Sequence, residues 1–223
     1  MTILFVLLTF LVIMAITYYT RGHQPQPVVA KQPAMFANPP APKVTRDLGF
    51  EIPQGYCFHP GHTWVLDEGR QNARIGMDAF AANLLGKVDR VEVAGLNRWV
   101  RQGQKVWSVT RDGATVDMVS PVEGVVIAVN SDVLRDPSLL NKDPYKDGWI
   151  AVIKSPDLSI NVNNLVRGSL VPVWMQNALR RVGTFTAQMA GATAQDGGLP
   201  IEGLLAHVEP GVRTQMVKEF FLT

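Results

Sequence analysis

Cysteine is almost absent from this chain: Cys57 is the only one among 223 residues. A single cysteine excludes a framework of internal disulfides and is compatible with a reducing compartment. Charge is also scarce, at 18% of residues with a net charge of +2, and no basic stripe interleaved with aromatic residues occurs. Nucleic-acid binding is therefore not expected on electrostatic grounds.

The sequence also lacks the motifs of common catalytic centres. It has no Gly-Lys-Ser/Thr phosphate loop, no Cys-x-x-Cys-His haem attachment, no Gly-x-Ser-x-Gly elbow and no paired-carboxylate signature. Cys57, His59 and His62 offer one thiolate and two imidazoles, but a zinc site needs a fourth ligand or a supported open position, and only His207 lies downstream. We expect no catalysis, no metal and no small-molecule substrate.

One long apolar run, Thr2 to Tyr19, contains no charged residue. As a helix rising ~1.5 Å per residue, it would span most of a hydrocarbon core of about 30 Å. A cleaved signal peptide is the alternative, but it needs a basic start and a small-x-small cleavage site, and neither precedes Arg21. We expect a retained transmembrane anchor over residues 1–21, in contact with the lipid bilayer through Thr2 to Tyr19.

Positive charge follows this run, at Arg21, Lys31, Lys43 and Arg46, and no basic side chain precedes it. The positive-inside rule then places the body in the cytoplasm and the N-terminus outside, although the N-terminal amine argues weakly against this orientation. The expected location is the inner, cytoplasmic membrane of the cell, crossed once.

Residues 22–55 are rich in proline, with Pro25, Pro27, Pro33, Pro39, Pro40, Pro42 and Pro53. Such density is expected to prevent helix and sheet and to favour extended polyproline-like segments, which predicts a mobile linker. The alternative is an ordered strap, in which Val28-Val29, Met35-Phe36 and Leu48-Gly49-Phe50 lie along a partner's surface.

The body is organised around the β-rich stretch from Trp107 to Asn130. Two runs flank Asp112-Gly113, which is a strong hairpin signal because the turn requires positive φ and these residues tolerate it. Ser120 to Gly124 then combines a proline, which cannot donate to a ladder, with a glycine that permits a bend before the strand Val125 to Val129. The predicted order is a hairpin with an exposed apex, a corner and a strand.

Short apolar runs elsewhere predict further strands and a helix. The expected strands are Thr63 to Leu66, Ala73 to Ile75, Val91 to Val93, Trp99 to Val100 and Lys105 to Val109, with a helix over Met77 to Leu85. The spacing of the turns is typical of a compact β-sandwich or flattened barrel.

Several of these blocks resemble, in the same order, the H protein of the glycine cleavage system, a lipoyl-carrier domain. They are His62-Thr63-Trp64-Val65, Ala73 to Ala81, Leu85-Gly86-Lys87-Val88, the Ser120 to Gly124 corner, Asp136 to Tyr145 and Gly148-Trp149-Ile150. The resemblance covers roughly Tyr56 to Pro156. It implies a domain over 56–160 with two small sheets packed face to face, and it implies structural roles for Asn141, Asp143, Tyr145 and Trp149. His62 is then expected to open the first strand, with His59 in the connecting loop.

The resemblance places the family's lipoyl-lysine at Gly113 and its preceding Glu-Ser-Val at Thr110-Arg111-Asp112. A swinging arm needs an amine at the exposed apex to reach several active sites, and none is present there. We expect a plain turn with no bound cofactor. A lipoylated Lys105, at the far end of the first hairpin strand, is the alternative.

Residues 161–223 are expected to form a helical extension. Val171, Trp174, Met175, Ala178, Leu179 and Val182 recur at helical spacing, which predicts an amphipathic helix that packs on the sandwich or, alternatively, on lipid. Two short helices, Pro200 to His207 and Pro210 to Phe221, are predicted after a small-residue linker. The expected partner-binding stripe comprises Val208, Val212, Met216, Phe220 and Phe221.

The predicted fold is mainly β with short helices: a flattened β-barrel or sandwich of the lipoyl-carrier type, one N-terminal transmembrane helix and a C-terminal helical extension. The expected function is that of a non-catalytic, membrane-anchored accessory subunit within an integral membrane complex, photosynthetic or respiratory by analogy of architecture alone. The alternative is a membrane-tethered carrier of a glycine-cleavage-like or other lipoate-linked system with an unrecognised attachment site.

Overall fold

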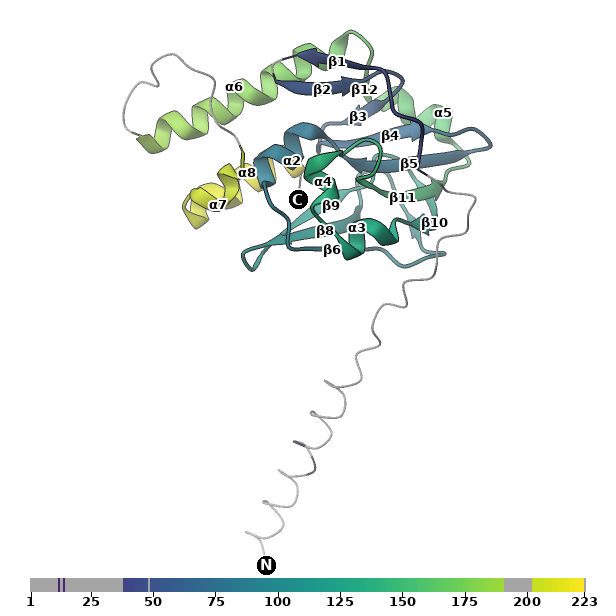
Figure 1. Ribbon diagram of the computed structural model, residues 1–223, viewed down its shortest axis with the longest axis horizontal. Helices are drawn as coiled ribbons and strands as arrows, with labels where there is room; N and C mark the ends of the chain where they lie inside the picture. The colour runs from purple at the N-terminus through teal and green to yellow at the C-terminus, as the bar shows by residue number, and fades with distance from the viewer. Residues whose placement is uncertain (1–11, 13, 15–37, 48, 191–201, 223) are drawn as a thin grey trace, which may run out of the picture. The chain divides into compact units, whose positions relative to one another are not determined.

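The computed structural model describes residues 12, 14, 38–47, 49–190 and 202–222 (Figure 1). Contacts group Gln32–Thr223 into one compact unit. The predicted anchor over residues 1–21 lies outside the described residues except at two positions. Among the residues that are described, no helix is both long enough and apolar enough to cross a bilayer.

The larger sheet has seven strands in the order β12-β3-β4-β5-β11-β10-β7, and neighbouring strands are antiparallel. In chain order these are β3 (Cys57–His59), β4 (Thr63–Asp67), β5 (Asn72–Met77), β7 (Trp99–Val100), β10 (Gly124–Val129), β11 (Trp149–Lys154) and β12 (Val166–Arg167). Trp64 pairs with Gly76, where an added Cβ would lie 2.5 Å from the Trp64 ring. Glycine is therefore required beside this buried indole.

The smaller sheet contains the predicted hairpin. Its strands β6 (Arg90–Val93), β8 (Lys105–Arg111) and β9 (Ala114–Val119) lie in the order β6-β8-β9. Arg111 pairs with Ala114, and the two intervening residues, Asp112 and Gly113, have φ values of 48° and 76°. Positive φ at both central residues is typical of a type I′ turn, so the hairpin prediction is confirmed.

Most of the predicted helices are present. The helices are α2 (Ala79–Leu85), α3 (Ser131–Arg135), α4 (Leu139–Lys142), α5 (Leu158–Asn161), the 3₁₀ helix η2 (Val162–Asn164), α6 (Leu170–Ala190), α7 (Leu204–His207) and α8 (Pro210–Phe221). The amphipathic helix is confirmed as α6, which is 21 residues long. Helix α7 begins later than predicted, directly after Gly203, whose φ of 67° is left-handed.

The prediction that proline would prevent sheet throughout residues 22–55 is wrong. Strand β1 (Val44–Asp47) pairs antiparallel with β2 (Phe50–Pro53), in register from Val44↔Pro53 to Asp47↔Phe50. The ten residues between Pro42 and Pro53 contain no proline, so their ladder keeps its donors. Phe50 is buried and its ring centroid lies 6.1 Å from that of Phe80, so this part of the linker packs on the body of its own chain.

The expected partner-binding stripe is also corrected, because it lies within the core of the chain's own domain. Val208, Met216, Phe220 and Phe221 are buried, and Val212 is partly buried against the same core. Helix α8 packs against β9 and α6. These elements present apolar side chains of their own, and docking within one chain avoids the entropy cost of association.

Candidate functional site

The apex of the β8–β9 hairpin is exposed and held in a defined shape. The Asp112 backbone N donates to Asp89 Oδ2 at 2.8 Å, and the hydroxyl oxygens of Thr110 and Thr115 lie 3.1 Å apart across the strands. A Cβ added at Gly113 would meet no atom within 4 Å. The apex therefore projects freely, and any group attached there would face open space.

The apex offers no amine. Lys105 lies at the opposite end of β8, where it pairs with Val119, the last residue of β9. Its Nζ forms an ion pair of 2.6 Å with Asp117 Oδ1. Lys105, the alternative attachment point, thus lies at the base of the hairpin. Its charge is already paired with that of Asp117.

Arg111 ties the end of the hairpin to the helices beside it. One of its terminal nitrogens, Nη1, donates to the Leu85 carbonyl, and Nε donates to Asp112 Oδ2 at 3.3 Å. A Cβ on Gly86 or Gly203 would collide with Nη1 of this guanidinium. Two glycines, one after α2 and one before α7, therefore leave the space that Arg111 occupies.

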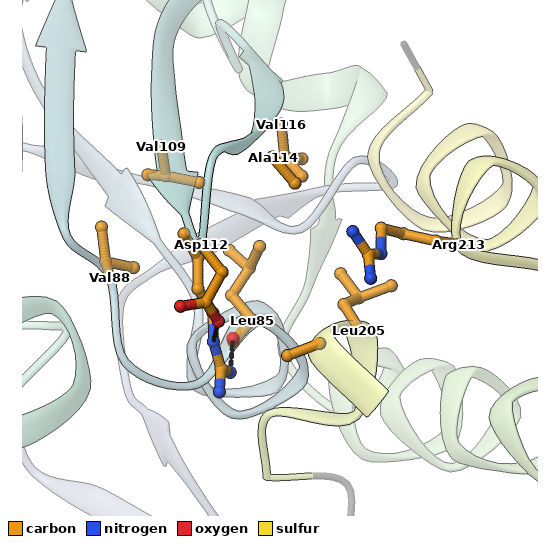
Figure 2. Close-up of a pocket in the computed structure, with 10 residues that line it drawn as sticks. Leu85, Val88, Val109, Asp112, Ala114, Val116, Leu205 and Arg213 are labelled. Atoms are coloured by element: carbon orange, nitrogen blue, oxygen red, sulfur yellow. Dashed lines mark hydrogen bonds and ion pairs between the residues drawn. The ribbon is translucent and has the colours of Figure 1, made fainter. Parts of the chain in front are cut away.

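A small pocket adjoins the hairpin (Figure 2). Its volume is about 100 Å³, and it is lined by Leu85, Val88, Val109, Arg111, Asp112, Ala114, Val116, Leu205, Ala206 and Arg213. Its lining residues come from the hairpin, from α7 and α8, and from the end of α2 and the connection that follows it. The wall is mostly aliphatic, with two guanidinium groups and one carboxylate.

A second polar cluster lies deep in the domain, around His62. His62 Nδ1 is 2.8 Å from Asp78 Oδ2, and neither side chain is exposed. The imidazole is stacked between Phe80 and Trp174, with ring centroids 4.2 and 4.6 Å away. Asp78 Oδ1 also accepts from the Ala81 backbone N and so caps α2. Full burial gives this pair a structural role, because no substrate reaches it.

The candidate metal ligands Cys57, His59 and His62 each have different surroundings. His62 directly precedes β4, close to its predicted place, with φ of 58°. His59 Nδ1 accepts from the Gly61 backbone N at 3.0 Å, and burial, with a contribution from His62, lowers the pKa of His59. Burial raises the pKa of the Cys57 thiol. Within the described residues, no three Cys, His, Asp or Glu side chains are grouped as a metal site.

Two residues that the structure places at these sites, Asp78 and Arg213, were not among the predicted site residues. Asp78 lies within the helix predicted over Met77 to Leu85, whereas it is the N-cap of the observed α2, and its contact with His62 spans 16 residues. Arg213 reaches the pocket only because α8 packs on β9. Contacts between distant segments of this kind leave no local pattern.

The residues with structural roles implied by the resemblance lie at the junction of α2 and β11. Tyr145 Oη accepts from the Ala79 backbone N at 3.1 Å, and Asn141 donates to the Ala82 carbonyl at 2.7 Å. Trp149 is buried, whereas Asp143 Oδ1 accepts from the Lys146 backbone N. All four side chains contribute to packing or to loop hydrogen bonds.

The small antiparallel β domain and its exposed hairpin apex are the features that the resemblance to a lipoyl-carrier domain implied. The family model described as glycine cleavage H-protein matches residues 56–175. This chain belongs to the glycine cleavage H-protein family.

Two relatives agree with this assignment in their sequences. The chain is 34% identical over 110 residues to the glycine cleavage system H protein of Prochlorococcus marinus, covering 49% of this chain and 84% of the relative. It is 37% identical over 100 residues to that of Vibrio cholerae, covering 45% and 79%. A crystal structure of the Mycobacterium marinum H protein aligns with a TM-score of 0.47 and 23% identity, over 53% of this chain and 94% of the other.

Proposed function

We propose that this protein is a non-catalytic, membrane-anchored accessory subunit of a membrane protein complex, built on an H-protein-type domain that has no lipoyl acceptor at its apex. The observation that carries the proposal is Gly113. It occupies the exposed turn of a well-formed hairpin, and the turn has no amine to which an acyl arm could be joined.

The geometry of the apex supports a domain that has lost its carrier function but has kept its fold. The turn keeps its two-residue form and its hydrogen bond to Asp89. A carrier needs a reactive group at this point, whereas a subunit that serves only as a scaffold needs only the fold. The altered residue therefore removes the carrier function at this position and leaves the domain intact.

Because the apolar side chains of α8 are buried within this chain, the proposed partner contact lies on α6. Leu170 and Val173 are 65% and 56% exposed, and their spacing of three residues puts them on one face of α6. Exposed apolar side chains on one face are typical of a contact surface. The uncharged run Thr2 to Tyr19 supplies the proposed membrane contact.

Family membership favours one alternative, a lipoate-linked carrier that uses another lysine. Lys105 is 54% exposed, so a ligase could reach it. Its ion pair with Asp117 and its place at the base of the hairpin argue against it, because an arm attached there starts a full strand length from the apex.

Intact-mass spectrometry of the protein isolated from its native membrane separates the two functions. The accessory role predicts the mass of the unmodified chain, together with co-purification of other membrane subunits after gentle detergent extraction. A stoichiometric lipoyl adduct that disappears in Lys105→Arg would instead establish the carrier. Isolation of the unmodified chain alone, with no co-purifying subunit, would contradict the accessory role.

A further inference from the structure

We infer that the pocket between the β8–β9 hairpin and α7–α8 is a binding site for a short-chain monocarboxylate, held non-covalently with its carboxylate on Arg213. The site is independent of the proposed function, because it requires neither a lysine at the apex nor a membrane partner. Three of its ten lining residues, Leu205, Ala206 and Arg213, come from α7 and α8, which lie beyond the part of the chain that the family model matches.

The apolar wall fits an alkyl chain. Leu85, Val88, Val109, Val116 and Leu205 line the pocket, and each is at most 5% exposed. Ligand sites are mostly apolar, with a few polar groups that fix orientation. A volume of about 100 Å³ limits the chain to a few carbons.

Arg213 provides the polar end of the site. In the part of the chain that the structure describes, its Nε is buried without a hydrogen-bond partner. Its terminal nitrogen Nη2 makes one long hydrogen bond, of 3.4 Å, to the Val208 carbonyl. Figure 2 shows the Arg213 side chain extending from α8 toward Leu205 and Ala114. A buried donor without an acceptor is costly, and a carboxylate is the acceptor that matches a guanidinium in two parallel hydrogen bonds.

The remaining charges favour a single negative charge on the ligand. Arg111 is already engaged by the Leu85 carbonyl and by Asp112. Asp112 is 73% exposed, so solvent screens its charge. The pocket therefore has two cations and one carboxylate, which leaves one positive charge for a monoanion.

Binding is tested by titrating butanoate into the full-length chain, held in lipid nanodiscs and labelled with ¹³C at valine and leucine methyl groups. The expected result is saturable shifts of the Val109, Val116 and Leu205 methyls. Butanamide has the same chain without the charge and is expected to bind at least about tenfold more weakly. Arg213→Gln should weaken butanoate binding by about tenfold or more, whereas Arg180→Gln, on the exposed face of α6, should leave it unchanged.

A second variant separates binding from folding. Ala206→Leu keeps the charge of Arg213 but places a larger side chain in the pocket, and it should abolish the butanoate shifts while the thermal transition stays in place. The inference is overturned if butanoate causes no saturable shifts, if butanamide binds equally well, or if Ala206→Leu binds as tightly as the unmodified chain.

Discussion

At the hairpin apex, Asp112 is 73% exposed and a side chain at Gly113 would meet nothing, whereas His62 and Asp78, in the same domain, have no exposed surface. A side chain at the apex contributes little to packing, so the main restriction that the fold places on Gly113 is its left-handed φ of 76°, which costs another residue about 1 kcal/mol. Around His62, each side chain contacts several others. Substitutions at the apex, where the family's chemistry is located, should therefore destabilise the fold little. Substitutions in the buried cluster should destabilise it much more.

The same comparison explains the C-terminal extension. The family model ends at residue 175, yet Phe220 of α8 lies 5.4 Å from Phe80 of α2 and 6.1 Å from Phe185 of α6, between ring centroids. Arg181 also lies over the Phe220 ring, 5.3 Å from its centroid. The extension belongs to the buried region rather than to an exposed surface.

The largest effect is expected from Phe220→Ala. This change removes a fully buried ring and leaves a cavity between α2, α6 and α8, which should lower the free energy of unfolding by about 3–5 kcal/mol. Urea unfolding followed by tryptophan fluorescence measures it. Leu222→Ala, two residues on and half exposed, is the matched control and should change stability by less than about 0.5 kcal/mol. Similar stability for the two variants would mean that α8 does not pack as the structure shows.

Asp78→Ala should have the next largest effect. It removes the cap of α2 and leaves His62 Nδ1 without its buried partner. Together these losses should cost about 2–4 kcal/mol. Asp78→Asn retains an oxygen for the cap and is expected to lose distinctly less, and equal losses in the two variants would assign the whole effect to the carboxylate charge. Both are measured by chemical unfolding at neutral pH.

Alkaline pH should weaken the same buried region. Burial raises the pKa of Tyr56 to about 12 and that of Tyr145 well above its ordinary value. Because the folded state holds these protons more tightly than the unfolded chain, whose tyrosines titrate near ~10, the stability they contribute is present below about pH 10 and is lost as pH rises toward about 12.

The share of Tyr56 in this loss is about 2–3 kcal/mol, since each unit of pKa difference is worth about 1.4 kcal/mol. Unfolding curves collected from about pH 9 to about pH 12 should therefore show a shallower decline for Tyr56→Phe than for the unmodified chain. At neutral pH, Tyr56→Phe should cost only about 1 kcal/mol, for its hydrogen bond to the Tyr145 carbonyl. Parallel pH profiles would contradict the assignment.

The sequence predicted the elements whose signals are local. Asp112-Gly113 fixed the hairpin because the turn demands positive φ, and the spacing from Val171 to Val182 fixed α6 because a helix repeats every 3.6 residues. Blocks in a constant order pointed to the family that the comparison then matched. Each of these signals lies within a few residues of the structure it specifies.

The errors and omissions concern contacts between distant segments. An apolar stripe such as that of α8 shows that a surface will cover it, but not whether that surface belongs to the same chain. The high proline content of residues 22–55 hid the β1–β2 hairpin, in which the only proline is Pro53, at the end of β2. The Arg213 pocket and the His62–Asp78 pair arise only when helices and strands pack, so no local pattern could indicate them.

A small change in stability is expected at the apex, from Gly113→Lys. Gly113 has a left-handed φ of 76°, so lysine should cost about 1 kcal/mol, and Gly113→Asn should cost less because asparagine tolerates this conformation. The variant restores an amine at the exposed turn, yet we expect little lipoylation when it is expressed with a lipoate ligase. The resemblance places Glu-Ser-Val before the family's lysine, whereas Thr110, Arg111 and Asp112 stand here, with Arg111 held by the Leu85 carbonyl.

Intact-mass spectrometry measures this outcome, with a lipoylated H protein expressed in parallel as the positive control. Robust modification of Gly113→Lys would show that the surroundings still suit a ligase and that the chain lost only its acceptor. An unmodified lysine in a folded domain would show that the apex has diverged in its surroundings as well. Because both outcomes require a folded domain, they test the chemistry of the apex separately from the packing around His62.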